Sequence, residues 1–391
     1  MKLGLVLEGR VATTPPSVSF FEGGLGKTGF GHTPRRIEAS LAQAALLGRF
    51  EPRTDLALTA QANVDAAHDF GRRVDIVEAF ARYTPAVTDT VSLDIKAGLF
   101  FPGISLENTE PGWLSPYTTT FSSINSWVGE EVRSLGIEAG PSLLAGETRL
   151  SVFGALTTRN DPTGTLLAWR GFALHDRVGG FADRLPLAPL SIFTRAGLFP
   201  DQPEYVEPMR EVDGRWTWSA GVSVRHPRYR VKALYQPRTA NPGAFDGQQY
   251  AWRTGYAAIG LARVFGPFEF LVQGLDGETR MGVLPSGRNA VVAGFRAAYG
   301  LGTWASPSNR HRTTLRFDAF RVTDRDEFKS DDPNRETGSA WTFAYRLEPA
   351  KHHAVTLEIL RVDSDRENRR DLRLKTRVLE VSGTLSWRIT F

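Results

Sequence analysis

The chain has no cysteine and no apolar run long enough to cross a membrane as a helix. The absence of cysteine excludes a disulfide framework, a thiolate nucleophile and a cysteine-ligated metal site. A transmembrane helix needs about 20 predominantly apolar residues, and no run here approaches that length. The 47 basic and 43 acidic residues nearly balance, leaving a net charge of +4. That small excess predicts neither a nucleic-acid partner nor a polybasic membrane anchor.

The start of the chain, MKLGLVLEGRV, lacks a full signal peptide. Its apolar run covers only about five residues before Glu8, whereas the apolar region of a signal peptide has roughly 7 to 15. We expect this segment to be the first strand of a mature chain from which the signal has been removed, with Met1 as an added start.

The last seventeen residues, KTRVLEVSGTLSWRITF, alternate between apolar and polar side chains. Successive side chains of a strand point to opposite faces, so one face here suits an apolar medium and the other suits water. A final strand that ends on Phe391 is similar to the C-terminal strand of bacterial outer-membrane β-barrels. An edge strand of a soluble sandwich also alternates, so the rest of the chain must decide.

Strand candidates with one apolar face recur along the whole sequence, and eighteen can be placed. The weakest are 164–175 and 190–199, and without them the count is sixteen. The eighteen segments are 3–7, 36–50, 56–64, 74–83, 91–101, 132–140, 147–157, 164–175, 190–199, 214–225, 228–236, 252–265, 268–279, 289–300, 311–323, 339–347, 353–363 and 375–391.

Short and long connections alternate between these strands. Tight turns at Glu51-Pro52, His226-Pro227 and Gly266-Pro267 all fall on one side. The long segments fall on the other side: 11–35, 102–131, 200–213, 237–250, 325–337 and 364–373. This pattern predicts one domain, 1–391, folded as an all-β, transmembrane, antiparallel up-and-down β-barrel with long loops outside the cell. At sixteen to eighteen strands the interior is too wide for wall side chains to fill, so an aqueous channel is expected.

The segment 102–131, PGISLENTEPGWLSPYTTTFSSINSWVGEE, is the third outward loop. Its many large apolar groups would be unfavourable in water, so we expect it to fold into the lumen and narrow the channel. A loop lying over a neighbouring subunit or lipopolysaccharide is the alternative. The candidate constriction residues are Glu107, Asn108, Glu110, Trp113, Tyr117 and Glu130.

Strand parity also predicts which charged residues line the wall of the channel. A charge on the lipid face costs about 2–4 kcal/mol at the membrane midplane, which favours an inward orientation. Loop acids facing wall bases would create a transverse field across the opening. The predicted wall residues are Asp94, Lys96, Arg149, Lys232, Arg296, Arg316, Asp318, Arg346, Glu358, Glu380 and Arg388.

The stretch LDIKAGLFFPGISLENTEPGW resembles the G-x-F-x-P-P-x-G-L-E segment of the phosphate-selective porin O and P family. The strand VDIVEAFARYT before it is similar as well. Gly103 and Ser105 depart from the family pattern, where proline and glycine stand. The matching residues are Gly98, Phe100, Pro102, Leu106 and Glu107. The resemblance implies a trimeric outer-membrane porin that passes anions along arginines and lysines.

We therefore predict passive diffusion of small hydrophilic solutes across the bacterial outer membrane, with anions such as phosphate as candidate solutes. The expected partners are outer-membrane lipid, lipopolysaccharide and two further copies of the chain, with no cofactor, metal or nucleic acid. A closed structural or surface-binding barrel is the alternative. An enzyme is not expected, since none of the seven histidines lies in a recognisable catalytic motif.

Overall fold

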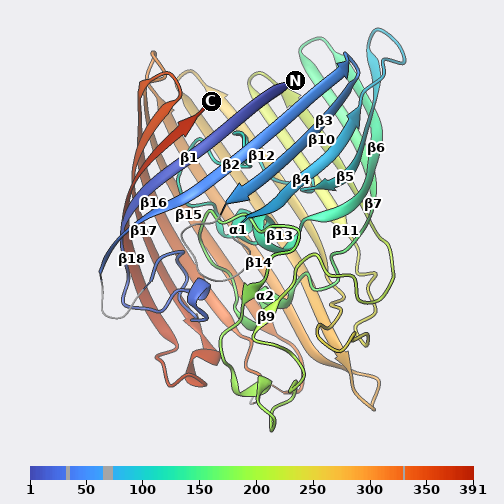
Figure 1. Cartoon of the computed structure of the whole chain (residues 1–391), viewed down its shortest axis with the longest axis vertical. Coiled ribbons are helices and arrows are strands. Elements are labelled where there is room, and N and C mark those ends of the chain that lie inside the picture. The colour runs from blue at the N-terminus through green and yellow to red at the C-terminus, as the bar shows by residue number, and fades with distance from the viewer. Residues whose placement is uncertain (32–35, 65–73, 329–330) are drawn as a thin grey trace.

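A computed structural model of the chain shows a closed antiparallel barrel in which the first and last strands pair with each other (Figure 1). It describes residues 1–31, 36–64, 74–328 and 331–391. Parts of two predicted outer loops, 32–35 and 329–330, lie outside the described residues, as does 65–73.

Sixteen strands form the barrel, and each pairs with its neighbours in sequence order except that β7 pairs directly with β10. They are β1 (Lys2–Thr13), β2 (Ile37–Arg53), β3 (Leu56–Val64), β4 (Val74–Tyr83), β5 (Val91–Phe100), β6 (Ser134–Ala145), β7 (Thr148–Thr158), β10 (Thr217–His226), β11 (Tyr229–Gln236), β12 (Gly255–Phe265), β13 (Phe268–Val283), β14 (Asn289–Ala305), β15 (His311–Asp324), β16 (Glu336–Ala350), β17 (His353–Arg366) and β18 (Arg377–Thr390).

The other elements lie in the connections. They are α1 (Ser123–Glu131), α2 (Thr165–Trp169), the two-stranded sheet of β8 (Leu185–Pro186) and β9 (Tyr205–Val206), and the 3-10 turns Phe20–Glu22, Ser191–Phe193 and Glu367–Arg370. No helix within the described residues is long and apolar enough to cross a membrane.

The barrel has sixteen strands, so the alternative count is confirmed and the count of eighteen is wrong. Predicted strand 164–175 contains α2, and predicted strand 190–199 contains only a 3-10 turn. Both belong to one connection, 159–216, that enters the lumen. Side chains there such as Leu166, Trp169 and Phe172 are buried. Their apolar character therefore reflects packing inside the barrel and not a wall strand.

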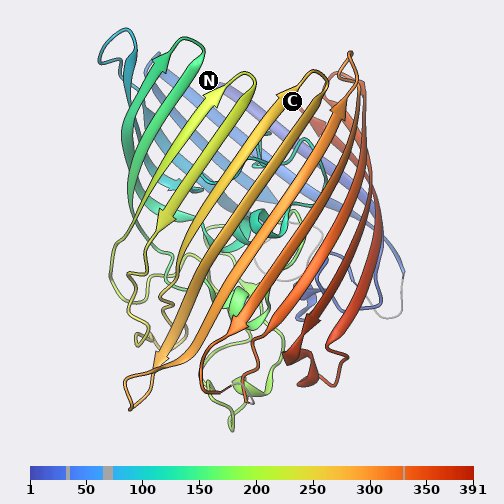
Figure 2. The same ribbon diagram turned by 180° about the vertical axis from the view of Figure 1, so that it is seen from behind.

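The two ends of the barrel differ, as the alternation of short and long connections predicts. Both termini and most of the tight connections lie at one end, which we call the turn end (Figures 1 and 2), whereas the short connection 284–288 lies at the other end. The long connections lie at the opposite, loop end: 14–36, 101–133, 159–216, 237–254, 325–335 and 367–376. The predicted separation of turns from long loops is confirmed, although β1 extends to Thr13, three residues into the loop predicted from 11.

The outer skin of the barrel is apolar. Alternate strand positions expose large side chains such as Leu58, Leu150, Ile259, Leu357 and Leu385. Exposed aromatic rings gather near the turn end, among them Phe265, Phe268, Trp304, Trp387 and Phe391. An apolar band with aromatic residues at its border is the surface pattern of barrels that sit in lipid.

The loop-end half of the lumen is filled. Helices α1 and α2 lie inside the barrel (Figure 1) and contact the inner face of β14. Their apolar side chains pack with the wall, as the rings of Trp127 and Phe295 do at 5.3 Å. The buried core therefore lies within the barrel, between the loops and the strands β12 to β17. Its members include Phe121, Ile124, Trp127, Leu166, Trp169, Phe172, Leu174, Trp252, Phe295 and Tyr299.

Candidate functional site

The third long connection, 101–133, folds into the lumen as predicted. All nine residues of α1 within it are buried. Ser122 caps the helix by accepting a hydrogen bond from the backbone N–H of Asn125 at 3.3 Å, which satisfies one of the free donors of the first turn. The loop thus enters the barrel as an ordered element with its own helix.

Arg316 of β15 is the main anchor of this loop. Its guanidinium pairs with Glu107 of the loop at 2.7 Å and with Asp318 of its own strand at 2.8 Å, and all three side chains are fully buried. It also donates to the carbonyl oxygens of Thr120 and Phe121 at 2.7 and 2.9 Å. A buried charge is tolerated only when it is paired and hydrogen-bonded, and here each condition is met.

Two wall carboxylates, Asp318 and Glu358, accept backbone N–H groups of the loop. Asp318 accepts from Ser123 at 2.8 Å, at the N-terminus of α1, where the helix dipole favours a negative charge. Glu358 of β17 accepts from Thr119 at 2.7 Å and from Thr120 at 3.2 Å. These charges belong to the inner wall as predicted, but they hold the loop and are not in contact with an open channel.

A chain of alternating charges continues from the loop around the wall. Glu110 of the loop pairs with Arg346 at 2.9 Å and with Arg388 at 2.8 Å. From Arg388 the chain runs through β1 into the 159–216 connection. Its further links are Arg388–Glu8 at 2.7 Å, Glu8–Arg10 at 2.6 Å and Arg10–Asp176 at 2.5 Å. Two connections, 101–133 and 159–216, are thereby fixed to three strands, β16, β18 and β1, that lie far apart in the sequence.

Glu130, at the end of α1, is held by the 159–216 connection. It pairs with Arg170 at 2.6 Å and lies 3.0 Å from Nε2 of His175. Burial alone would raise the pKa of Glu130, but Arg170 and His175 outweigh it and lower the pKa. The pKa of His175 is lowered chiefly by burial. Glu130 is therefore a structural anion of the filled half.

The first loop is tied to the wall in the same way. The backbone N–H of Lys27 donates to Glu380 of β18 at 2.8 Å, and its ammonium group donates to the carbonyl of Arg170 at 2.9 Å. The ammonium also pairs with Glu336 of β16. Glu380 is thus on the inner face, as predicted, but buried under the first loop.

The remaining predicted loop residues are also packed. The amide of Asn108 donates to the carbonyl of Trp113 at 2.8 Å, and the Trp113 ring stacks on Phe101 at 4.4 Å. The hydroxyl of Tyr117 donates to Glu269 of β13 at 2.9 Å. The loop therefore reaches the wall on both sides of the lumen.

The lumen is open on the other side of this loop, toward the turn end. A cavity of about 570 Å³ lies there, bounded by Gly103 of the loop and by the inner faces of β4 to β7, β10 and β11. Its charged and hydroxyl lining comprises Arg82, Asp94, Glu138, Arg149, Arg225, Lys232, Thr84, Ser92, Ser142, Ser151 and Ser223. We call this surface the basic wall and include Lys96, which pairs with Glu138 at 3.1 Å.

The basic wall carries more cations than its acids can neutralise. Asp94 pairs with Arg82, and Glu138 pairs with Lys96. Lys232 donates to the carbonyl of Ser105 at 2.7 Å. Arg149 and Arg225 have no carboxylate partner within the described part of the chain. Five basic side chains face two acidic ones, so this half of the lumen is positive.

Arginines on three adjacent strands lie next to one another in this wall. Arg149 of β7 is the register partner of Arg225 of β10, and Arg225 is that of Arg230 of β11. Arg230 is partly neutralised by Glu269 at 2.5 Å. Arg82, Arg225 and Arg230 are inward-facing residues that are missing from the predicted wall set. Their strand parity, shared with Lys96, Arg149 and Lys232, was the signal that could have found them.

Two sequence predictions about the wall are wrong. Arg296 lies on the outer face of β14 with its side chain 73% exposed, next to Asp276. The residues that face inward on this strand include Phe295 and Tyr299, because the lumen beside β14 is filled with apolar side chains. The loop acids also do not face wall bases across an opening: Glu107, Glu110 and Glu130 each contact arginines directly.

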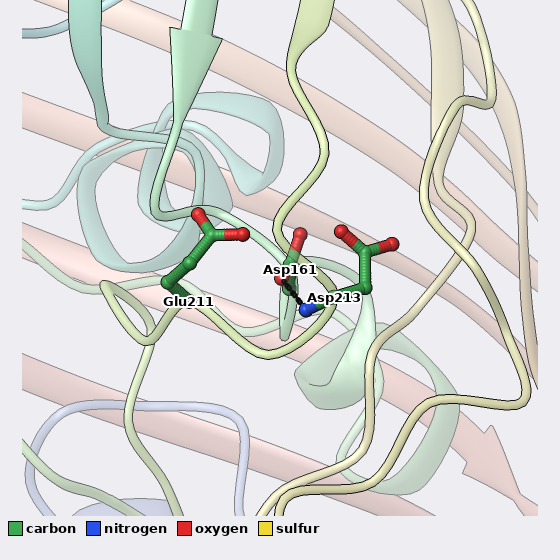
Figure 3. A group of neighbouring side chains, drawn as sticks. All are labelled: Asp161, Glu211 and Asp213. Carbon is green, nitrogen blue, oxygen red and sulfur yellow. Dashed lines mark hydrogen bonds between the residues drawn. The ribbon is translucent and has the colours of Figure 1, made fainter.

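Three loop carboxylates at the loop end come close together: Asp161, Glu211 and Asp213 (Figure 3). Asp161 accepts the backbone N–H groups of Val212 and Asp213 at 2.6 and 2.9 Å, and Glu211 accepts that of Gly214 at 2.8 Å. Burial, with the neighbouring acids, raises the pKa of Asp161 to about 7. These bonds fold the loop, and the cluster alone assigns no metal.

No protein-family model matches the chain, and no curated protein is similar to it in sequence. The resemblance to the phosphate-selective family is therefore not confirmed. Solved structures with the same fold are outer-membrane porins and channels. The outer membrane channel DcaP of Acinetobacter baumannii has a TM-score of 0.59 at 13% identity, and the match covers 100% of this chain and 96% of that one.

Two further structures share the fold at similar distance. The anion-selective porin from Comamonas acidovorans has a TM-score of 0.55 at 8% identity, covering 100% of this chain and 99% of that one. The trimer form of OmpT from Vibrio cholerae has a TM-score of 0.54 at 9% identity, covering 100% and 99%. The three likenesses define a porin-type barrel, and at these identities they define the fold alone.

Proposed function

We propose that this protein is an outer-membrane porin through which small hydrophilic solutes diffuse passively, with a preference for small anions. The observation that carries the proposal is the basic wall, where Arg149 and Arg225 face the open cavity without a carboxylate partner. Fixed guanidinium groups replace the water that an anion loses in a narrow passage. Phosphate and small carboxylates are therefore candidate solutes.

The membrane location follows from the outer skin. Contiguous exposed apolar surface of this extent is unfavourable in water but fits hydrocarbon, and closure of the barrel pairs every strand edge. The loop end then faces outward and the turn end faces the periplasm. The printed descriptions of DcaP as an outer membrane channel and of the Comamonas porin as anion-selective support this proposal.

We further propose a homotrimer, as the trimer form of the Vibrio structure suggests. The outer faces of β2 and β3 carry small side chains, Ala39, Ala60 and Ala62, that would let neighbouring barrels approach closely. Crosslinking of the detergent-extracted protein that yields only monomers would count against this assembly.

A closed structural barrel is the second candidate, because the filled loop-end half of the lumen favours it. Planar-bilayer recording separates the two. We expect discrete channels and, in a tenfold KCl gradient, a reversal potential with the sign of anion preference. Replacing chloride with phosphate should preserve that sign. Absence of conductance from correctly folded protein would favour the closed barrel, and a cation-selective reversal potential would refute the proposed role of the basic wall.

A further inference from the structure

The outer face of the barrel carries an unusual cluster of charge around Glu278 of β13. The outward residues before it on this strand, Phe268, Phe270 and Val272, are apolar and exposed. Three arginines converge on the single carboxylate of Glu278. Arg280 pairs with it at 2.7 Å, Arg325 pairs with it at 2.7 Å, and Arg238 also pairs with it. The group, which we call the arginine cluster, keeps two uncompensated positive charges.

The surrounding strands are shaped to hold this cluster. The register partners of Glu278 on both sides are glycines, Gly255 of β12 and Gly294 of β14. A methyl group at Gly255 would lie 2.6 Å from Cγ of Arg238, and one at Gly294 would lie 2.7 Å from Cζ of Arg325. The two arginines therefore lie flat over backbone that has no side chain. Their guanidinium groups remain open, since the side chains of Arg238, Arg280 and Arg325 are 42%, 38% and 49% exposed.

A hollow in the outer surface, of about 1070 Å³, begins directly on the turn-end side of this cluster. Its floor is made of small outward side chains across five strands: Ala233, Ala257, Gly274, Ala298 and Ala319. Arg296 and Arg321, which are register partners, line the edge of the hollow nearest the loop end, together with Asp276. Asp276 pairs with Arg296, while Arg321 has no carboxylate partner among the described residues. The charged rim adds to the positive field above an apolar floor.

The distance of these charged groups from the turn end places them at the level expected for lipid headgroups of the outer leaflet. Asp276 follows Phe268, the first residue of β13, by eight positions. With a rise of roughly 3.3 Å per residue and a tilt near 45°, Asp276 lies about 19 Å above the turn end and Glu278 about 23 Å. The apolar band of an outer-membrane barrel is about 25 Å tall. The arginine cluster therefore lies at the outer border of that band and the hollow lies within it.

We infer that the hollow and the arginine cluster together form a binding site for a phosphate-bearing acyl lipid of the outer leaflet. Guanidinium groups form paired hydrogen bonds with phosphate, and the small-residue floor gives acyl chains a close fit. The occupant is chosen by complementarity, because cations at headgroup height above an apolar groove match a phosphorylated lipid. This inference rests on the proposed membrane location.

Native mass spectrometry of the full chain in mild detergent, titrated with bisphosphorylated lipid A, tests the site. In the triple variant Arg238→Gln, Arg280→Gln, Arg325→Gln we expect bound lipid A to fall by about tenfold or more. Removing the competing carboxylate with Glu278→Gln should instead tighten binding. The matched control, Arg361→Gln with Arg377→Gln on β17 and β18, should leave binding unchanged. Dephosphorylated lipid A should bind wild type as weakly as lipid A binds the triple variant.

The hollow is tested separately by Ala298→Trp, which fills the floor and leaves the arginines in place. We expect lipid A binding to weaken while inorganic phosphate, the second probe, binds no differently. Lipid A binding that is equal in wild type, the triple variant and Ala298→Trp would overturn the inference. The inference would also be overturned if these variants no longer formed oligomers but still bound lipid A, because this surface would then be a contact with a second copy of the chain. Bilayer conductance of the triple variant should be unchanged, so a failure here is distinguishable from failure of the channel proposal.

Discussion

The two sides of the lumen wall carry charges at the same alternating positions, yet the charges on the two sides have different surroundings. On β15 to β18 and β1, the inward charges are buried and paired with loop groups, as Arg316 is with Glu107. On β4 to β7, β10 and β11, several inward charges line a cavity, and Arg149 and Arg225 among them have no carboxylate partner in the described chain. Strand parity places a residue on the inner face, but the loop in front of it determines whether its side chain pairs with loop groups or lines the open cavity.

The strongest test of this difference is to remove Arg316, the residue that anchors the third loop to the wall formed by β15 to β18 and β1. Arg316→Ala would leave Glu107 and Asp318 buried without their shared cation, and we expect a loss of about 3–5 kcal/mol in the free energy of unfolding. The loop should also loosen, so conductance should rise. Thermal unfolding in detergent measures the first effect and bilayer recording the second.

Arg225→Ala on the open side is the matched control. Its side chain has no carboxylate partner in the described residues, so we expect a change of less than about 0.5 kcal/mol. Equal destabilisation by the two substitutions would show that the two walls do not differ as described.

A second test uses the titration of the filled side. Burial raises the pKa of Asp332, in the 325–335 connection, to about 7. Its carboxylate accepts hydrogen bonds from the side-chain amide of Asn334 at 2.8 Å and from the indole N–H of Trp169 at 3.3 Å. The side-chain oxygen of an asparagine could accept both. Between about pH 4 and pH 7 the unfolded chain loses this proton while the folded chain keeps it, so stability falls as pH rises.

Asp332→Asn should remove that slope and stabilise the protein at pH 7 by up to about 4 kcal/mol. The measurement is the thermal midpoint of wild type and variant from pH 4 to pH 8. Midpoints that differ by the same amount at every pH would refute the assignment of the slope to Asp332.

The third test changes selectivity with little effect on stability. Arg149→Glu with Arg225→Glu replaces two positive charges of the basic wall with two negative ones, and the reversal potential in a KCl gradient should change sign. Arg296→Glu, on the outer face, is the control and should leave the reversal potential unchanged. An unaltered sign in the double variant would place the selectivity elsewhere in the lumen.

The sequence predicted the strands well where one face was clearly apolar, as in the final strand up to Phe391. It failed where apolar residues pack inside the lumen. The segment around Trp169 looked like a strand, although its side chains belong to the interior core. On β14 the large residues Phe295 and Tyr299 face inward, and the outward positions beside Arg296 are glycine or alanine. The rule that large apolar side chains face lipid and charged side chains face the lumen therefore placed Arg296 on the wrong face.

The sequence by itself determined the closed antiparallel barrel, the division into turn end and loop end, and the entry of the 102–131 loop into the lumen. Period-two alternation and turn chemistry are local properties, and they can be read without knowing any contact. Only the tertiary structure decided which inner charges form ion pairs with loop groups and which face the cavity, because each such pair joins residues far apart in the chain. Arg316 and Arg149 look alike in sequence, and they differ only in whether a folded loop covers them.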